Sequence, residues 1–367
     1  MSKLSWTFKN QDAASYDFTS SVRYFTYTQG RRSVLDNYAG GRATITMAND
    51  NGQVAAASLS YRQRVFIRCE GTVAFRGWVQ GIEYDDTPTG AASTATIILG
   101  DAWILAGQQF ADSQVLASEQ LQVQEIADLQ FYPGYFEQDF NSSKIRGSLN
   151  YSGDYASRLN EIVASDRGQF VSIAGVYKYF PFEQMVTLQN PTFTFGRSPS
   201  ASVIGYQSFD RMQAIGNETY VNNAQVTPES LATQTYTNPE ALTYGESTIT
   251  VATLNTTTAD GLNTARWIAN SMASTTQQSF NVGVLDVSQT SLTNLADLLT
   301  QGPIIELAYT PPGGASTTEW ITVEGLTVRG FNDRTEINFN ISPLTYYRVF
   351  ILDDAVFGVL DSSRLGW

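Results

Sequence analysis

Polar and apolar side chains alternate along much of the first hundred residues. The stretch 42–47, Arg-Ala-Thr-Ile-Thr-Met, changes side at every residue and stops at 49–52, Asn-Asp-Asn-Gly. A period of two is that of a half-buried strand, and Asn and Gly tolerate the positive φ of a turn. Further strands are predicted at 64–68, 73–79, 81–84 and 94–99, with a hairpin at Glu70-Gly71. Short strands at this spacing predict a small barrel or sandwich.

Helical spacing is confined to a few short segments. Leu159, Ile162 and Val163 fall at i, i+3 and i+4 and predict a helix over 155–165, which Gly168 is placed to end. The same spacing predicts helices over 258–272 and 292–299, and Leu121, Ile126 and Leu129 could share one face of a helix within 101–130. Later strands are expected at 170–173, 303–310, 319–328 and 336–341, and the stretch 177–195 is aromatic and β-prone.

These elements predict a mainly β fold with short helices, divided into several modules. A chain of 367 residues exceeds the size at which one hydrophobic core usually stops growing. The composition and the pattern of apolar residues change near residues 101, 221 and 346. We therefore expect a β module at 1–100, an α+β region at 101–220, a second β-rich module with short helices at 221–345, and a tail at 346–367.

The charge balance bears on the partners. The chain has 22 Lys and Arg against 35 Asp and Glu, which gives a formal net charge of -13. Proteins that grip nucleic acid neutralise its phosphates with Lys and Arg, so this composition argues against such binding. It does not argue against a surface past which nucleic acid slides. No apolar run approaches the roughly 20 residues of a membrane span, the opening residues predict no signal peptide, and the single cysteine fits a reducing cytosol.

The absence of histidine removes several classes of chemistry. No Ser-His-Asp triad, Cys-His pair or His-Glu-x-x-His zinc site can form. Carboxylates alone can still hydrolyse glycosides, so the composition removes the commonest catalytic groups and not all of them. We predict no catalytic, cofactor or metal site and no enzymatic activity.

Several local features invite a functional interpretation, and simpler structural ones are preferred. The segment 49–52 lacks the remaining ligands of a calcium loop and is read as a turn. The pairs Asp85-Asp86 and Asp353-Asp354 are read as solvated loop charges. Cys69 is expected to be a small buried residue, and Arg31 and Arg32 to be surface ion-pair donors. Aromatic residues make up 12% of the chain, which suits a core, a protein interface or carbohydrate stacking equally.

Four stretches, in this order, resemble tail hub or baseplate hub proteins of siphophages, encoded near the tape-measure protein. The first runs from Gly30-Arg31-Arg32 through Leu35-Asp36 and Ala39-Gly40 to the strand that ends at 49–52. It departs from the family pattern at two points. Met47-Ala48 stands where Leu-Asp is common, and the Phe-Asp-Pro that often follows is missing. The others are the helix at 158–165 with the strand at 168–171, the helices at 262–269 and 292–299, and the ending 350–367, with Leu352-Asp353-Asp354 and Leu365-Gly366-Trp367.

This resemblance implies a structural subunit of the virion, located at the tail tip and assembled in the host cytoplasm. Hub proteins of this kind carry two β-barrel domains per subunit, and a homotrimer then presents six barrels to the sixfold tail tube. The expected partners are the distal tail protein, the tape measure protein and tail fibre or tip proteins. The genome is expected to pass through the channel during ejection without specific binding.

Three alternatives remain open at this stage. The chain could be the hexameric distal tail protein, although two separate β modules favour the hub. It could be a hub that degrades the host cell wall, against which the absence of histidine counts. It could also be a tail-tip adhesin that binds host surface glycan, for which the aromatic residues are the only indication.

The segment after Tyr346 is too short to fold alone and is expected to dock on a neighbouring subunit or on the chain's own last barrel. Truncation after Tyr346 should therefore disrupt assembly. The candidate assembly residues are Val349, Phe350, Ile351, Val356, Phe357, Leu360, Leu365 and Trp367.

Overall fold

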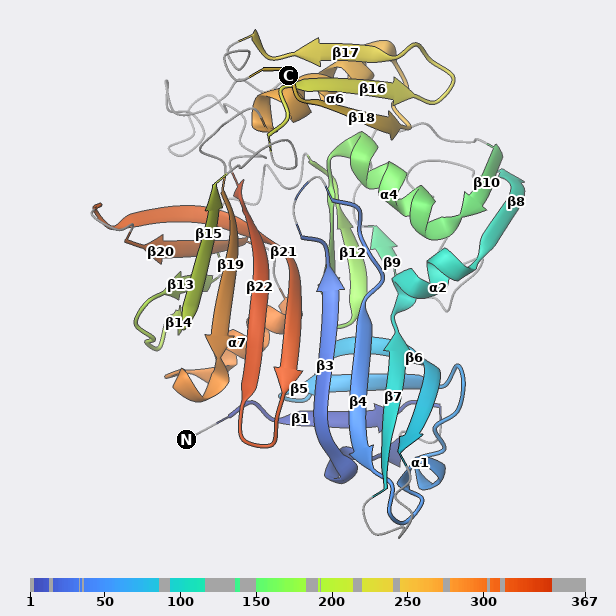
Figure 1. Ribbon diagram of the computed structural model, residues 1–367, viewed down its shortest axis with the longest axis vertical. Helices are drawn as coiled ribbons and strands as arrows, with labels where there is room; N and C mark the ends of the chain where they lie inside the picture. The colour runs from blue at the N-terminus through green and yellow to red at the C-terminus, as the bar shows by residue number, and fades with distance from the viewer. Residues whose placement is uncertain are drawn as a thin grey trace.

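The computed structural model describes most of the chain, in segments separated by gaps. The described residues are 3–12, 16–32, 34, 36–85, 93–115, 136–138, 150–182, 191, 193–213, 220–239, 245–272, 278–301, 304–310 and 314–344. They form a mainly β structure with short helices, as predicted (Figure 1). No helix in these segments is long and apolar enough to span a membrane.

A 14-stranded sheet forms the largest part of the molecule. Its first half comes from the N-terminal residues and is antiparallel throughout, in the order β3-β4-β7-β6-β5-β1-β2. The bounds are β1 Trp6–Asn10, β2 Tyr16–Asp17, β3 Val22–Gly30, β4 Arg42–Ala48, β5 Arg64–Cys69, β6 Thr72–Asp85 and β7 Thr94–Gly100, with the short helices η1 Thr19–Ser21 and α1 Gln53–Ala56.

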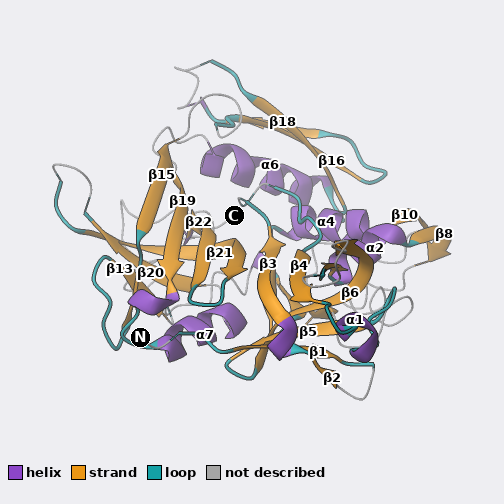
Figure 2. Ribbon diagram, turned by 60° about the horizontal axis from the view of Figure 1, so that its bottom comes forward, coloured by secondary structure: helices purple, strands orange, loops and turns teal. Residues whose placement is uncertain are grey.

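The second half of the sheet comes from later in the chain. Its strands are β13 Phe193–Gly196, β14 Val203–Gly205, β15 Ser208–Gln213, β19 Gln278–Leu285, β20 Ile304–Tyr309, β21 Thr317–Gly330 and β22 Thr335–Pro343, with the helices η3 Asp286–Ser288 and α7 Leu292–Gln301. In Figure 2 the two halves curve side by side. Neither half closes into a barrel over the described residues.

Strand β21 joins the two halves. Its first residues pair with β20, its last residues pair with β3, and β22 lies along its other side. A bulge between Val323 and Gly325 interrupts the β22 ladder where β21 passes from one half to the other. Bulges bend a strand and increase its twist, which is the change of course that a strand shared by two curved halves requires.

One hydrophobic core runs behind both halves. Alternate residues of the strands enter it, such as Ala43, Ile45 and Met47 of β4. Leu295, Leu298 and Leu299 of α7 complete the same core, which is the helical spacing read from the sequence. Because the core is continuous across the β21–β3 pairing, the halves pack as one body.

A smaller region covers one end of the first half. It contains α2 Ala102–Gln108, β8 Phe110–Val115, β9 Phe136–Gln138, β10 Asn150–Asp154, α4 Tyr155–Asp166, β11 Gln169–Ile173 and β12 Val176–Phe180. Its core is aromatic, with Trp103 packed against Tyr38, Phe170 and Tyr177 at ring-centroid distances of 5.2, 5.2 and 5.5 Å. Burial of these large rings contributes much of the apolar surface of this core.

A third core lies at the top of Figure 1, beneath a small sheet. The sheet has the order β17-β16-β18, with bounds β16 Asn223–Pro228, β17 Gln234–Thr237 and β18 Thr248–Thr253, and α6 Thr258–Met272 packs on it. Ala265, Ile268 and Ala269 of this helix are buried, in agreement with the predicted helical face.

Most predicted elements are present, with two differences in detail. The stretches 73–79 and 81–84 belong to the single strand β6, which has a bulge between Val79 and Gly81. The helix over 155–165 ends through Arg167, whose φ of 60° is left-handed, and not through Gly168. Residues 116–130, with Leu121, Ile126 and Leu129, lie outside the described part. The four domain limits stay a prediction, although β13 and β15 pair with strands from beyond residue 221.

Candidate functional site

The outward face of one run of strands is a polar surface that extends across both halves of the sheet. We call this run, β15-β19-β22-β21-β3-β4-β7-β6, the front layer. Side chains of successive residues point to opposite faces of a strand, so each strand that buries one set of residues presents the other set outward. In β4 the outward set is Arg42, Thr44, Thr46 and Ala48.

Cross-strand partners show how uniform this face is. A row of direct neighbours crosses from β15 to β4 in the order Ser208, Gly283, Asn338, Thr327, Thr28, Arg42. Five of these six residues are uncharged. Thr46 and Thr96 form another neutral pair, with their hydroxyl oxygens 3.5 Å apart. This part of the face is therefore polar and uncharged apart from Arg42, and the exposed Asp210 of β15 lies opposite Asn281 on the same face.

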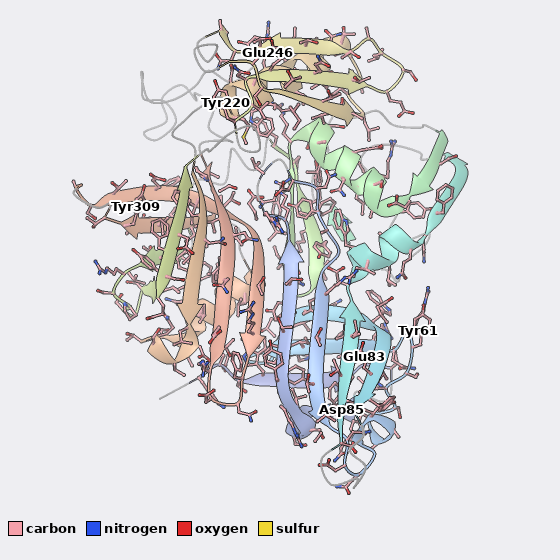
Figure 3. The ribbon with its side chains drawn as sticks, viewed as in Figure 1. Tyr61, Glu83, Asp85, Tyr220, Glu246 and Tyr309 are labelled. Carbon is pink, nitrogen blue, oxygen red and sulfur yellow. The ribbon has the colours of Figure 1, made fainter. Side chains whose placement is uncertain are left out.

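The charges that do occur on the front layer are few and of both signs. Arg329 of β21 lies opposite Glu336 of β22 in the ladder. Glu83 and Asp85 lie toward the lower end of β6, at the right-hand edge of the layer (Figure 3). Such spacing does not form the basic stripe that phosphate binding requires.

A buried charged junction holds the front layer to the smaller region. The Arg31 backbone N–H donates to the Glu324 carbonyl at 2.8 Å, and the Arg31 guanidinium lies over the ring of Tyr38. The side-chain amide of Gln169 donates to the Val323 carbonyl at 2.8 Å, and its oxygen accepts from the Thr322 hydroxyl at 3.0 Å. Three distant parts of the chain thus meet at the bulge of β21.

This junction corrects one sequence prediction. Arg31 was expected to be a surface ion-pair donor, but its side chain is 2% exposed and its ion-pair partner Glu324 is fully buried. Arg31 is buried because its guanidinium bonds to Glu324 of β21, and Gln169 contacts the same carboxylate. Residues next to Arg31 in the sequence do not reveal these partners. Arg32 is exposed, which agrees with the surface position expected for it, whereas its expected role in an ion pair stays a prediction.

A second buried carboxyl group lies at the start of α2. Asp101 accepts from the backbone N–H groups of Trp103 and Ile104 at 3.0 and 3.2 Å, which caps the helix. The Tyr177 hydroxyl donates to its other oxygen. Burial raises the pKa of Asp101 to about 7, an effect that the hydrogen bond from Tyr177 and the backbone donors partly oppose. Since all these partners are structural, the group links β7 to β12 and does not face a substrate.

The remaining sequence-predicted features fall into two groups. Cys69 is buried as expected, and burial raises the pKa of its thiol, so it does not act as a nucleophile at neutral pH. Over the described segments, no group of three or more Cys, Asp or Glu residues is arranged to hold a metal ion. The eight candidate assembly residues, Val349, Phe350, Ile351, Val356, Phe357, Leu360, Leu365 and Trp367, all lie outside the described residues.

Comparison with known proteins places the fold. No family model matches the chain, and no curated protein matches it in sequence. A tail protein from Neisseria meningitidis has a TM-score of 0.64 at 9% identity, over 93% of this chain and 97% of that one. The 43 kDa tail protein of prophage MuSo2 from Shewanella oneidensis has a TM-score of 0.60 at 9% identity, over 94% and 98% of the two chains. This chain has a phage tail protein fold.

The phage tail fold extends to a secretion machine. A type VI secretion system component from Escherichia coli, itself described as similar in structure to the T4 bacteriophage tail proteins gp27 and gp5, has a TM-score of 0.51 at 12% identity. The match covers 88% of this chain and 73% of that one. The alignments span nearly the whole chain, so the fold includes both halves of the sheet and the regions above them.

Sequence reasoning missed the front layer as a site. The alternation in each strand was visible, for example in Arg42–Met47, but the order in which distant strands pair was not. One signal in the sequence was available. Many polar positions of these strands hold Thr, Asn or Ser, although Lys or Glu would be equally compatible with exposure to solvent.

Proposed function

We propose that this protein is a hub subunit of a siphophage tail tip, which closes the end of the tail tube. It connects the distal tail protein above to tip or fibre proteins below, and it surrounds a channel for the tape measure protein and the genome. Its location is the virion, at the tail tip. This proposal joins the phage tail fold to the resemblance carried by the N-terminal and C-terminal motifs.

The continuity of the front layer is the observation that carries the proposal. Strands of the two halves lie in one layer through the β21–β3 pairing, so each subunit brings two sheet segments side by side. We take the residues 1–100 and 221–345 as the two tube-like domains, and the strands β13–β15 add to the sheet of the second one. Three copies around an axis then supply six segments, which matches the sixfold symmetry of a tail tube.

The chemistry of the outward face supports its role as the channel wall. DNA adheres to surfaces that neutralise its phosphates, and strong single-sign charge creates a field across a pore. A wall in which Thr, Asn and Ser are frequent and the charges are few and of both signs does neither. The net charge of -13 acts in the same direction, since a negative subunit repels the polymer that it must let pass.

A measurement of copy number tests the proposal. Mass photometry of the purified chain, or of tail tips assembled from it, should give three subunits per ring. Six subunits would instead support the distal tail protein. A stable monomer that is absent from purified virions would contradict both readings. Activity on host peptidoglycan in a zymogram, or binding on a glycan array, would favour the wall-degrading or adhesin alternatives.

A further inference from the structure

A cluster of basic side chains lies on the outward face of β1, β5 and the first residues of β6, across the hydrophobic core from the front layer. The odd-numbered residues of β5 enter that core, so Arg64, Phe66 and Arg68 point away from it. In Figure 1 β1 and β5 cross behind β3 and β4. The first hundred residues carry 10 Lys and Arg against 8 Asp and Glu, whereas the whole chain has 22 against 35. This part of an acidic chain is therefore the part suited to an acidic partner.

A buried aromatic ring lies at the centre of this cluster. Phe66 is 8% exposed, although it belongs to none of the three hydrophobic cores of the described residues. Its direct cross-strand neighbours are Lys9 of β1 and Arg76 of β6. The guanidinium carbons of Arg76 and Arg68 lie 5.1 and 5.8 Å from the centre of the ring, and both arginines are half-buried. The ring is therefore covered by cationic side chains and not by an apolar layer.

The nearby carboxylates bind the other two cations of this face. Nζ of Lys9 lies 3.8 Å from Asp17, and Arg64 forms an ion pair with Asp12. In the described part of the chain Arg68 forms no ion pair, and its Nη1 donates to a backbone carbonyl at 3.1 Å. Two guanidinium groups held over one ring repel each other, and an anion that contacts both removes that repulsion.

The turn between β11 and β12 holds the stem of Arg76 in place. A Cβ added to Gly175 would lie 2.6 Å from Cγ of Arg76 and 2.9 Å from a methyl carbon of Val73, so the turn packs directly on both side chains. Gly175 has a φ of +74°, which permits this close approach. A side chain that is already fixed loses less conformational entropy when it binds a ligand.

We propose that Arg68 and Arg76, with the Phe66 ring beneath them, bind a carboxylate side chain from an acidic segment of a partner protein. A guanidinium presents a planar fork of donors that matches a carboxylate. Nucleic acid is disfavoured, because Asp12 and Asp17 lie beside the arginines and repel a chain of phosphates. The site adds a second interaction to the proposed channel role, since its face lies away from the front layer.

Saturation-transfer difference NMR on the purified full-length chain tests the site with three probes. They are the peptide acetyl-Gly-Glu-Asp-Glu-Gly-amide, its neutral counterpart with Gln and Asn, and a thymidine trinucleotide. We expect saturation to reach the acidic peptide and not the neutral one, with a signal that falls as salt rises. Equal signals from the two peptides, or a stronger signal from the trinucleotide, would overturn the proposal.

A pair of double variants locates the binding. Arg68→Met/Arg76→Met keeps an aliphatic cover over Phe66 while it removes both charges, and we expect it to weaken binding of the acidic peptide at least about tenfold. The matched control is Arg42→Met/Arg329→Met, which removes two exposed arginines of the front layer and should change the affinity less than about twofold.

Arg68→Lys/Arg76→Lys separates the charge from the fork. This variant should bind the acidic peptide more weakly than the unaltered chain does and more tightly than the Met variant. It also keeps both charges, so it tests the site even where the Met variant fails to fold. Unchanged binding in the Met variant, or an equal loss in the control, would contradict the assignment. All of these measurements use the purified chain without a ring, so they stand apart from the test of copy number.

Discussion

The Arg31 guanidinium donates through Nε to Oε2 of Glu324 over 2.7 Å, and the two side chains are 2% and 0% exposed. These residues lie 293 positions apart, so the bond fastens the segment after β3 to the bulge of β21. Removing one member of a buried ion pair leaves the other charge without compensation.

Substitution of this pair should be strongly non-additive. We expect Arg31→Met to lower the free energy of unfolding by about 3–5 kcal/mol, because the Glu324 carboxylate stays buried. The double variant Arg31→Met/Glu324→Leu should recover much of that loss. Urea unfolding followed by tryptophan fluorescence measures both. Additive losses in the double variant would mean that the two charges are not coupled.

Gly30→Ala should destabilise the same junction by a steric effect. The φ of Gly30 is +83°, and an added Cβ would lie 2.2 Å from the Glu324 carbonyl oxygen. Gly71 has a φ of +84° with nothing within 4 Å of its Cβ position, so Gly71→Ala isolates the cost of the left-handed conformation. We expect Gly30→Ala to cost about 1–3 kcal/mol more than Gly71→Ala in thermal or denaturant unfolding. Equal costs would show that the backbone relaxes freely there.

The stability of the protein should contain a pH-dependent contribution from Asp101. Burial raises the pKa of Asp101 in the folded state to about 7, well above its unfolded value, so the native state binds this proton more tightly. The contribution is complete below the unfolded pKa and is lost as the pH rises toward 7. Between pH 5 and pH 8 it amounts to roughly 2–3 kcal/mol.

Asp101→Asn provides the comparison for this prediction. Asn also caps helices, and its side-chain amide can donate to the Tyr177 oxygen. We therefore expect the difference in unfolding free energy between the unaltered chain and the variant to shift against the unaltered chain as the pH rises from 5 to 8. A difference that is independent of pH would contradict the raised pKa.

If the front layer is the proposed channel wall, lysines placed on it should make that wall bind DNA. The positions Thr28, Asn281 and Asn338 are exposed on the outward face. The triple variant to Lys should retain double-stranded DNA in assembled rings at low salt, with an affinity that falls steeply as salt rises. The matched control places lysines at the exposed residues Tyr61, Thr235 and Thr293, outside the front layer. Filter binding at several salt concentrations measures both, and equal retention by the two variants would argue against the channel wall.

Local patterns in the sequence were sufficient to predict most helices and strands. The buried face of β4 follows from the alternation of Ala43, Ile45 and Met47, and the hairpin at Glu70-Gly71 follows from Gly71, which accepts positive φ. Such features depend on residues that are close in sequence. Boundaries were less accurate where a bulge or an unusual cap intervened, as at Gly81 and Arg167.

The candidate site depends on pairings that a single sequence does not contain. Nothing near Gly30 indicates that β3 will pair with β21, and nothing near Arg31 indicates a carboxylate 293 residues away. The front layer and its polar face arise only when these strands are ordered. The mainly β character with short helices was therefore predictable from composition and period, whereas the two barrels implied by the resemblance are not seen in the described residues and the surface that carries the proposed function was not predicted.

Because β21 pairs with strands of both halves, the boundary between the halves within one subunit is not a flexible hinge. A mechanical force applied to one half is transmitted to the other half through the backbone hydrogen bonds of β21 with β20, β22 and β3. The force is distributed over all of these hydrogen bonds. In a ring of such subunits, the weakest lines are the seams between copies. If the proposed ring widens, it would then do so by whole subunits tilting apart, each keeping its internal shape.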